Sequence, residues 1–193
     1  MKKYQIIYAD PAWQYKDKIK HHGGSAESHY DTMDIQDIKD LPINNISDEN
    51  CVLFLWVTFP LLIEGLSVIE SWGFKYKTLG FVWIKANKRD STDQPKFFDT
   101  GLDEFLGMGN WTRSNSEVCL IGVKGKPKRV DTNIRQLVYY PIMQHSKKPP
   151  IVRDKIVKLC GDIPRVELFA RQKIDGWDVW GNEVESDINL VTI

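Results

Sequence analysis

Short apolar segments recur along the chain and predict buried strands. Residues 51–57 are apolar at every position, which is typical of a strand inside a parallel sheet whose two faces are both covered. Residues 5–9 form a similar segment that stops at Asp10, so they predict a strand with a carboxylate at its carboxyl end. Comparable segments predict further strands at residues 81–84, 117–123, 137–142, 166–169 and 177–180.

Apolar residues at helical spacing alternate with these strands. Residues 35–41 show this spacing after Thr32, which is a candidate helix cap. Residues 60–72 begin with a proline suited to a first helical turn and are followed by Gly73, a typical C-terminal cap. A third helix is predicted at residues 151–160. Strands that alternate with helices predict an α/β sandwich around a mostly parallel sheet.

Two polar stretches, at about residues 14–30 and 85–111, are longer than ordinary connections between elements. We predict that both are active-site loops. The chain length of 193 residues is that of one domain, so we expect a single domain over residues 1–193.

The composition narrows the class of protein. The chain carries 26 Lys and Arg against 26 Asp and Glu, so its net charge is zero and it is not a generically polybasic binder. Contact with nucleic acid would therefore have to come from local basic patches. No apolar run approaches the ~20 residues of a membrane helix, and no signal peptide is evident at the N-terminus. We therefore expect no membrane partner. The three cysteines suit neither a disulfide framework nor a paired metal site, so we also expect a cytoplasmic protein without a metal.

The segment Asp10-Pro11-Ala12-Trp13 follows the first predicted strand. In open α/β sheets, ligands bind outside the carboxyl ends of the strands. Proline stiffens the backbone so that the Asp10 carboxylate and the Pro11 carbonyl can face one small target, and Trp13 offers a ring for stacking. The alternative is an ordinary Asp-Pro turn with a tryptophan in the core, which four residues alone do not exclude.

Two later strand ends also carry polar groups. Arg171 follows one predicted strand, and Asn182 and Glu183 follow the next. These side chains are suitable donors and acceptors for ribose hydroxyls, although they could also be two exposed loop tips. Gly107 and Gly109 do not form a dinucleotide fingerprint, which should follow a strand and open a helix.

Taken in order, these segments resemble the DPPW-type adenine-N6 methyltransferases. This is the family of the catalytic subunit that methylates adenines in eukaryotic messenger RNA and of smaller bacterial and phage relatives. The resemblance runs from about Tyr4 to Val184 and includes residues 30–33, 53–58, 109–125, 145–149 and 167–183. It implies a Rossmann-like, S-adenosylmethionine-dependent methyltransferase sandwich with a circularly permuted motif order. One departure is Ala12, which stands where the family usually has a second proline.

The resemblance also implies roles for individual residues. Asp10 and Pro11 would hold the amine that is methylated, and Trp13 would stack on the base. S-adenosylmethionine is the expected cofactor. Its expected binding residues lie at strand ends or match a family lysine at the cofactor, and they are Asp10, Lys148, Phe169, Arg171, Asn182 and Glu183.

The expected substrate-binding residues fall in two groups. Tyr15 and Tyr30 would close over the base, with loop anchors as the alternative role. A basic run would contact phosphates, with a solvated surface as the alternative, and it comprises Lys124, Lys126, Lys128 and Arg129.

The predicted function is methyl transfer to the exocyclic amine of adenine in nucleic acid. DNA is favoured because the chain is compact and lacks added RNA-binding modules. The alternatives are an RNA adenine methyltransferase, an inactive binding subunit of the same fold and a small-molecule methyltransferase. Asp10 argues against the inactive subunit, and the basic run argues against the small-molecule enzyme. A homodimer and a heterodimer both stay open.

Overall fold

A computed structural model describes residues 2–14, 32–88, 102–107, 109, 111–143 and 146–190 of the chain. The chain divides into two compact units. The first unit comprises Met1–Thr78, Leu120–Lys128 and Ile163–Ile193, and the second comprises Leu79–Cys119 and Arg129–Asp162. The expected single domain over residues 1–193 stays a prediction.

The first unit is built on a sheet with the strand order β5-β2-β1-β7-β8. The central strands are β1 (Tyr4–Ala9) and β2 (Ser47–Val57), and β7 (Arg165–Leu168) lies between β1 and the last strand, β8 (Asp178–Trp180). Strand β5 (Ser116–Lys124) contributes its second half to this unit. The pairs β1–β2, β1–β7 and β7–β8 are all parallel. The predicted α/β fold with a mostly parallel sheet is confirmed.

Buried apolar side chains explain why β1 and β2 are central. From Ile6 to Ala9 and from Cys51 to Val57 every residue is buried, so these strands are covered on both faces, as the sequence predicts. Strand β2 starts earlier than expected, at Ser47. In the register Ala9 lies opposite both Leu55 and Leu168, which brings the carboxyl ends of β1, β2 and β7 to one edge.

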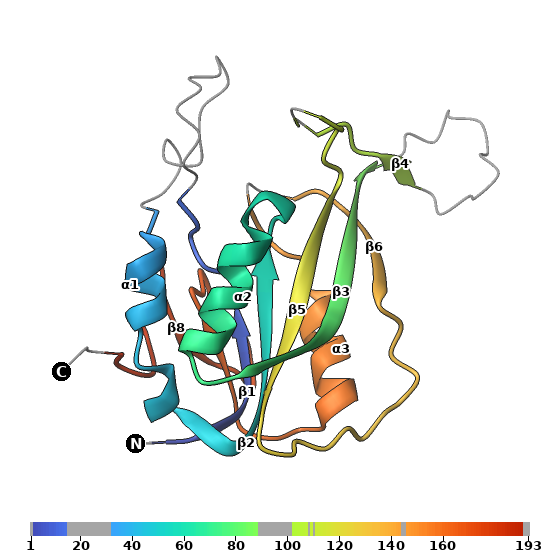
Figure 1. Cartoon of the computed structure of the whole chain (residues 1–193). Coiled ribbons are helices and arrows are strands. Elements are labelled where there is room, and N and C mark those ends of the chain that lie inside the picture. Colours follow the sequence, from blue (N-terminus) through green and yellow to red (C-terminus); the bar gives the residue numbers. More distant parts are fainter. Residues whose placement is uncertain are drawn as a thin grey trace. The chain divides into compact units, whose positions relative to one another are not determined.

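Two helices pack side by side in the first unit (Figure 1). Helix α1 (Ile35–Asp40) is capped by the Asp34 side chain, which accepts a hydrogen bond from the Gln36 N–H; the expectation that Thr32 is the cap is therefore wrong. The 3-10 turn η3 (Phe59–Leu61) leads into helix α2 (Leu62–Ser71). The Trp72 indole N–H donates to the Ile38 carbonyl at 2.8 Å and ties the two helices together. A further 3-10 turn, η2 (Ile43–Asn45), precedes β2.

The second unit contains most of strand β3 (Lys75–Lys88), which pairs antiparallel with β4 (Leu102–Glu104) and parallel with β6 (Leu137–Pro141). Helix α3 (Ile151–Cys160) ends at Gly161, as expected. The predicted loop at 85–111 is partly wrong, because its first residues continue β3 and it contains β4. Residues 89–101 of that loop and 15–30 of the other lie outside the described residues. Within the described part of the chain, no helix is long and apolar enough to cross a membrane.

Candidate active site

Asp10 follows β1 directly, at the edge where parallel strands end. Because β1 lies between β2 and β7, Asp10 is flanked in the register by the residues that follow Leu55 and Leu168. These are Trp56 in β2 and Phe169 after β7. We call this side of the first unit the carboxyl edge: Asp10–Trp13 together with the turns 169–173 and 181–183.

The turn after β1 is held by several hydrogen bonds. The Trp13 N–H donates to the Pro11 carbonyl at 2.9 Å, and the Trp13 indole N–H donates to the Trp56 carbonyl at 3.1 Å. The Met33 N–H donates to the Ala12 carbonyl at 2.9 Å, which brings the chain back to the same turn before α1. The backbone next to Asp10 is thereby fixed to β2.

The turns after β7 and β8 approach each other closely. The Ala170 N–H donates to the Trp180 carbonyl at 2.9 Å. A side chain at Gly181 would place its Cβ 2.1 Å from the Ala170 carbonyl oxygen, so only glycine fits there. Phe169 has a φ of 60° and packs edge-on against Trp180 with 5.3 Å between ring centroids.

Polar groups are exposed on these two turns. The Arg171 Nε lies 3.3 Å from the Glu183 Oε1, and both side chains are partly open to solvent. Asn182 is also exposed. A guanidinium, an amide and a carboxylate on adjacent turns offer both donors and acceptors, so this donor set fits a ligand that carries hydroxyl groups.

A second group of charges lies inside the second unit. The Glu117 carboxylate is 2.5 Å from the Lys85 ammonium and 3.2 Å from the Lys148 ammonium, and all three side chains are largely buried. Burial alone would raise the pKa of Glu117, but Lys148 and Lys85 together outweigh it and hold that pKa below its usual range. The sequence did not predict that Glu117 pairs with Lys85 and Lys148, although an acidic residue at the start of an apolar strand was a signal.

The comparison with protein families shows to which family the chain belongs. The family model described as MT-A70 matches residues 4–183. The chain belongs to the MT-A70 family. The resemblance inferred from the sequence is thereby confirmed, as is the expectation of a methyltransferase.

Curated relatives of this MT-A70 chain differ in how much of their length it covers. It is 34% identical over 201 residues to the type II methyltransferase M.MunI of Mycoplasma sp, covering 95% of this chain and 78% of the relative. It is 28% identical to a putative N(6)-adenosine-methyltransferase MT-A70-like protein of Medicago truncatula, and 25% identical to the human N(6)-adenosine-methyltransferase catalytic subunit METTL3. The chain spans only 28% of either of these two relatives.

The structure gathers most of the expected cofactor residues of this family member at the carboxyl edge. Asp10, Phe169, Arg171, Asn182 and Glu183 all follow parallel strands of the first unit. Lys148 belongs to the second unit, where it contacts Glu117. Tyr15 and Tyr30 lie outside the described residues.

Trp13 has less exposed surface than a stacking platform needs. Only 5% of it is exposed, and its indole N–H is bound to β2. In this structure the ring therefore belongs to the core, which is the alternative considered from the sequence. Stacking of Trp13 on a base stays a prediction.

The basic run begins at the opposite end of β2. The Lys124 ammonium donates to Asn44 at 3.1 Å and to Ser47 at 2.8 Å, and the Lys126 N–H donates to the Asn50 side chain at 2.7 Å. Ser47 lies opposite Tyr4, six residues before Asp10, so at ~3.3 Å per residue these contacts lie roughly 20 Å from the carboxyl edge. Lys124 and Lys126 therefore lie far from Asp10 along the strands. Phosphate contact by the run stays a prediction, and its last residue, Arg129, belongs to the second unit.

Proposed function

We propose that this chain transfers a methyl group from S-adenosylmethionine to the exocyclic amine of adenine, with DNA as the favoured nucleic acid. The observation that carries the proposal is the position of Asp10, which follows β1 at the same edge as the exposed polar turns after β7 and β8. A carboxylate for the substrate amine and a donor set for a nucleoside cofactor would then share one edge of one sheet.

On the cofactor side, Arg171, Asn182 and Glu183 would hold the sugar hydroxyls, and Phe169 would contribute an apolar contact. S-adenosylmethionine, when bound, supplies an electrophilic methyl group on a sulfonium. Lys148 is proposed as a further cofactor contact because it matches a family lysine.

On the substrate side, the amine of adenine is a poor nucleophile because its lone pair is delocalised into the ring. The Asp10 carboxylate would accept one N–H of the amine and the Pro11 carbonyl the other. That carbonyl already accepts the Trp13 N–H, but a carbonyl oxygen has two lone pairs and can accept a second hydrogen bond. Both contacts orient the nitrogen and stabilise the charge that develops on it. A base in a duplex would have to be flipped out first.

Sequence identity supports DNA over RNA. The chain is 34% identical to a bacterial type II methyltransferase but only 25% identical to the human enzyme, whose name specifies adenosine, a ribonucleoside. RNA is the second candidate, because the adenosine methyltransferases match almost the whole of this chain.

The test is transfer of labelled methyl groups to single-stranded and duplex DNA and RNA, offered separately. Activity on DNA that exceeds activity on RNA supports the proposal, and the reverse ranking overturns the preference for DNA. The molar mass of the active species is measured in parallel, because the human relative is named a subunit.

Asp10→Asn should lower kcat by about 10²–10³-fold, since it removes the charge that stabilises the developing cation. Asp37→Asn is the matched control, because Asp37 is an exposed aspartate on α1. Asp10→Asn with near-native turnover would disprove the role of Asp10. Cofactor binding without transfer to any nucleic acid would favour the inactive binding subunit.

A further inference from the structure

Residues 185–187 cover the open side of β8, the last strand in the first unit's sheet. The Asp187 N–H donates to the Val179 carbonyl at 2.8 Å, and the Val179 N–H donates to the Asp187 Oδ2 at 3.0 Å. Both backbone polar groups of Val179 are therefore satisfied by one residue. Covering an edge strand in this way prevents it from pairing elsewhere.

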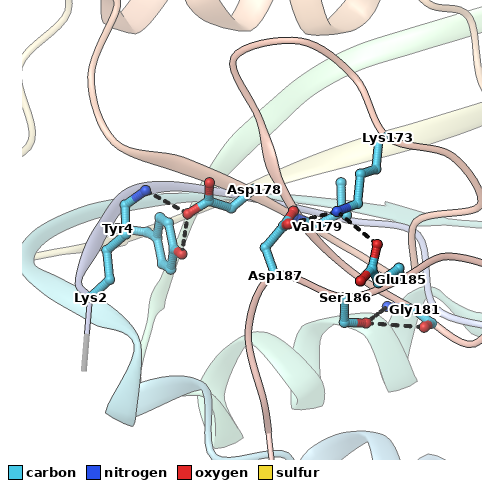
Figure 2. Close-up of polar contacts among 9 residues, drawn as sticks. All are labelled: Lys2, Tyr4, Lys173, Asp178, Val179, Gly181, Glu185, Ser186 and Asp187. Atoms are coloured by element: carbon cyan, nitrogen blue, oxygen red, sulfur yellow. Dashed lines mark hydrogen bonds and ion pairs between the residues drawn. The ribbon is translucent and has the colours of Figure 1, made fainter.

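The same three residues reach both turns of the carboxyl edge (Figure 2). The Ser186 hydroxyl accepts from the Gly181 N–H at 3.1 Å and lies 3.2 Å from the Gly181 carbonyl, to which it can donate. The Lys173 ammonium, on the turn after β7, donates to the Asp187 Oδ1 at 2.9 Å and lies 3.6 Å from the Glu185 carboxylate. We call residues 185–187 together with Lys173 the tail clamp.

The tail clamp adds to the backbone contacts between the two turns, whose exposed side chains hold each other weakly. The ion pair between Arg171 and Glu183 is partly open to solvent, and exposed pairs of this kind contribute little to stability. Gly181 already touches the Ala170 backbone, so a small shift of either turn would change the position of Arg171 against Glu183. The family match ends at residue 183, so the clamping residues 185–187 lie beyond it.

We propose that Asp187, acting with Ser186 and Lys173, is a positioning residue for the cofactor site, which it serves by fixing the distance between the turns that carry Arg171 and Glu183. The inference rests on the proposed function, in which those turns hold the cofactor's sugar. Asp187 touches neither cofactor nor substrate in this role. Its hydrogen bonds from Lys173 and Val179 also lower the pKa of Asp187, so it is anionic at neutral pH.

The test compares three variants by calorimetry with S-adenosylhomocysteine and by steady-state kinetics. Asp187→Ala removes both the backbone and the lysine contact, and we expect the Kd for the cofactor product to rise about tenfold. Asp187→Asn keeps an acceptor for Val179 but loses the charge facing Lys173, and Lys173→Met removes the same ion pair from the other side. Both should weaken binding less than Asp187→Ala. In all three, kcat at saturating cofactor and the KM for nucleic acid should stay within about twofold of wild type.

Lys2→Ala is the matched control. Lys2 pairs with Asp178 at the amino end of the same strand, with side chains 58% and 29% exposed against 50% and 34% for Lys173 and Asp187. This variant should leave the cofactor Kd unchanged. If Lys2→Ala raised the cofactor Kd as much as Asp187→Ala, the inference would be overturned. A lower melting temperature in Asp187→Ala with an unchanged Kd would show a merely structural clamp and would overturn it as well. If the wild-type chain itself bound no cofactor, the proposed function would fail and the inference with it. If wild type bound but all three variants bound equally well, the inference alone would fail.

Discussion

The two ends of the first unit's strands use their polar residues differently. At the amino ends of β1 and β8, Lys2 and Tyr4 both donate to Asp178, and Lys124 donates to Asn44 and Ser47 near the start of β2. We call this side the amino edge. At the carboxyl edge, Arg171, Asn182 and Glu183 remain exposed on turns that pack tightly through their backbones. Polar side chains at the amino edge join strands, whereas these three at the carboxyl edge stay exposed and are the ones proposed to hold the cofactor.

The difference follows from how parallel strands are connected. All carboxyl ends reach one edge, so turns from different parts of the chain meet there and can share one ligand. The backbone must then be fixed without using the functional side chains. Here the fixing groups include the buried Trp13 indole and the glycine contact at Gly181. The following predictions test this division of roles.

The largest effect is expected from Trp13→Ala. The side chain is 5% exposed and satisfies the Trp56 carbonyl, so its loss should lower the free energy of unfolding by about 3–5 kcal/mol. Trp111→Ala is the control, because Trp111 is fully exposed, and it should change stability by less than about 0.5 kcal/mol. Urea denaturation measures both. Equal stabilities of the two variants would mean that Trp13 does not anchor the carboxyl edge.

Trp13 also shows what could not be predicted from the sequence. The position of Asp10 could be predicted, because an apolar strand that ends in a carboxylate needs only a local pattern and the rule for parallel strand ends. Whether an adjacent tryptophan faces the core or a ligand depends on Trp56, which lies far along the chain. The local sequence is therefore compatible with a core tryptophan and with a ligand-facing one, and the pairing of the strands decides between them.

The strands likewise divide into those that the sequence predicts and those that it does not. Strands β1 and β2 were predictable because they are buried on both faces. The polar start of β2 and the three-residue strand β4 carry no apolar pattern, so they were missed. The place of Lys124 depends on β5 lying beside β2, which local periodicity does not encode. The partners of Glu117 are likewise distant in sequence.

Two glycines, one at each edge, test whether only the carboxyl edge affects cofactor binding. A Cβ at Gly181 would lie 2.1 Å from the Ala170 carbonyl oxygen, and one at Gly125 would lie 2.1 Å from the Glu49 carbonyl oxygen, near the start of β2. Both alanine variants should be destabilised, because a backbone atom has to move. Gly181→Ala should also raise the cofactor Kd by about tenfold or more, since it spreads the turns at the carboxyl edge. Gly125→Ala should leave the Kd of the folded protein unchanged. Calorimetry on both variants decides, and a similar Kd for both would erase the functional difference between the edges.

Variants of the basic run test whether the amino edge also contacts the substrate. Lys126 and Lys128 have exposed side chains, so we expect Lys126→Ala with Lys128→Ala to reduce the salt slope of nucleic-acid binding by roughly 0.7–0.9 per lost phosphate contact, for all sequences alike. Lys124→Ala should instead reduce stability, because its ammonium holds Asn44 and Ser47. Binding is measured by fluorescence anisotropy over a range of salt. An unchanged slope in the double variant would leave the run as a solvated surface.

The smallest effect concerns the pH dependence of the amino edge. Burial, followed by the hydrogen bond to Asp178, raises the pKa of Tyr4 well above its usual value near 10. The unfolded chain ionises this phenol first, so its contribution to stability is complete below about pH 10 and is lost as the pH rises from there toward the folded pKa. Tyr4→Phe should therefore lose less stability between about pH 9 and pH 11 than wild type does. Tyr76→Phe is the control, since Tyr76 is 48% exposed and should keep the wild-type profile. Urea midpoints across this range measure the difference, and parallel profiles for wild type and Tyr4→Phe would mean that the Tyr4 phenol is no more protected than a solvent-exposed one.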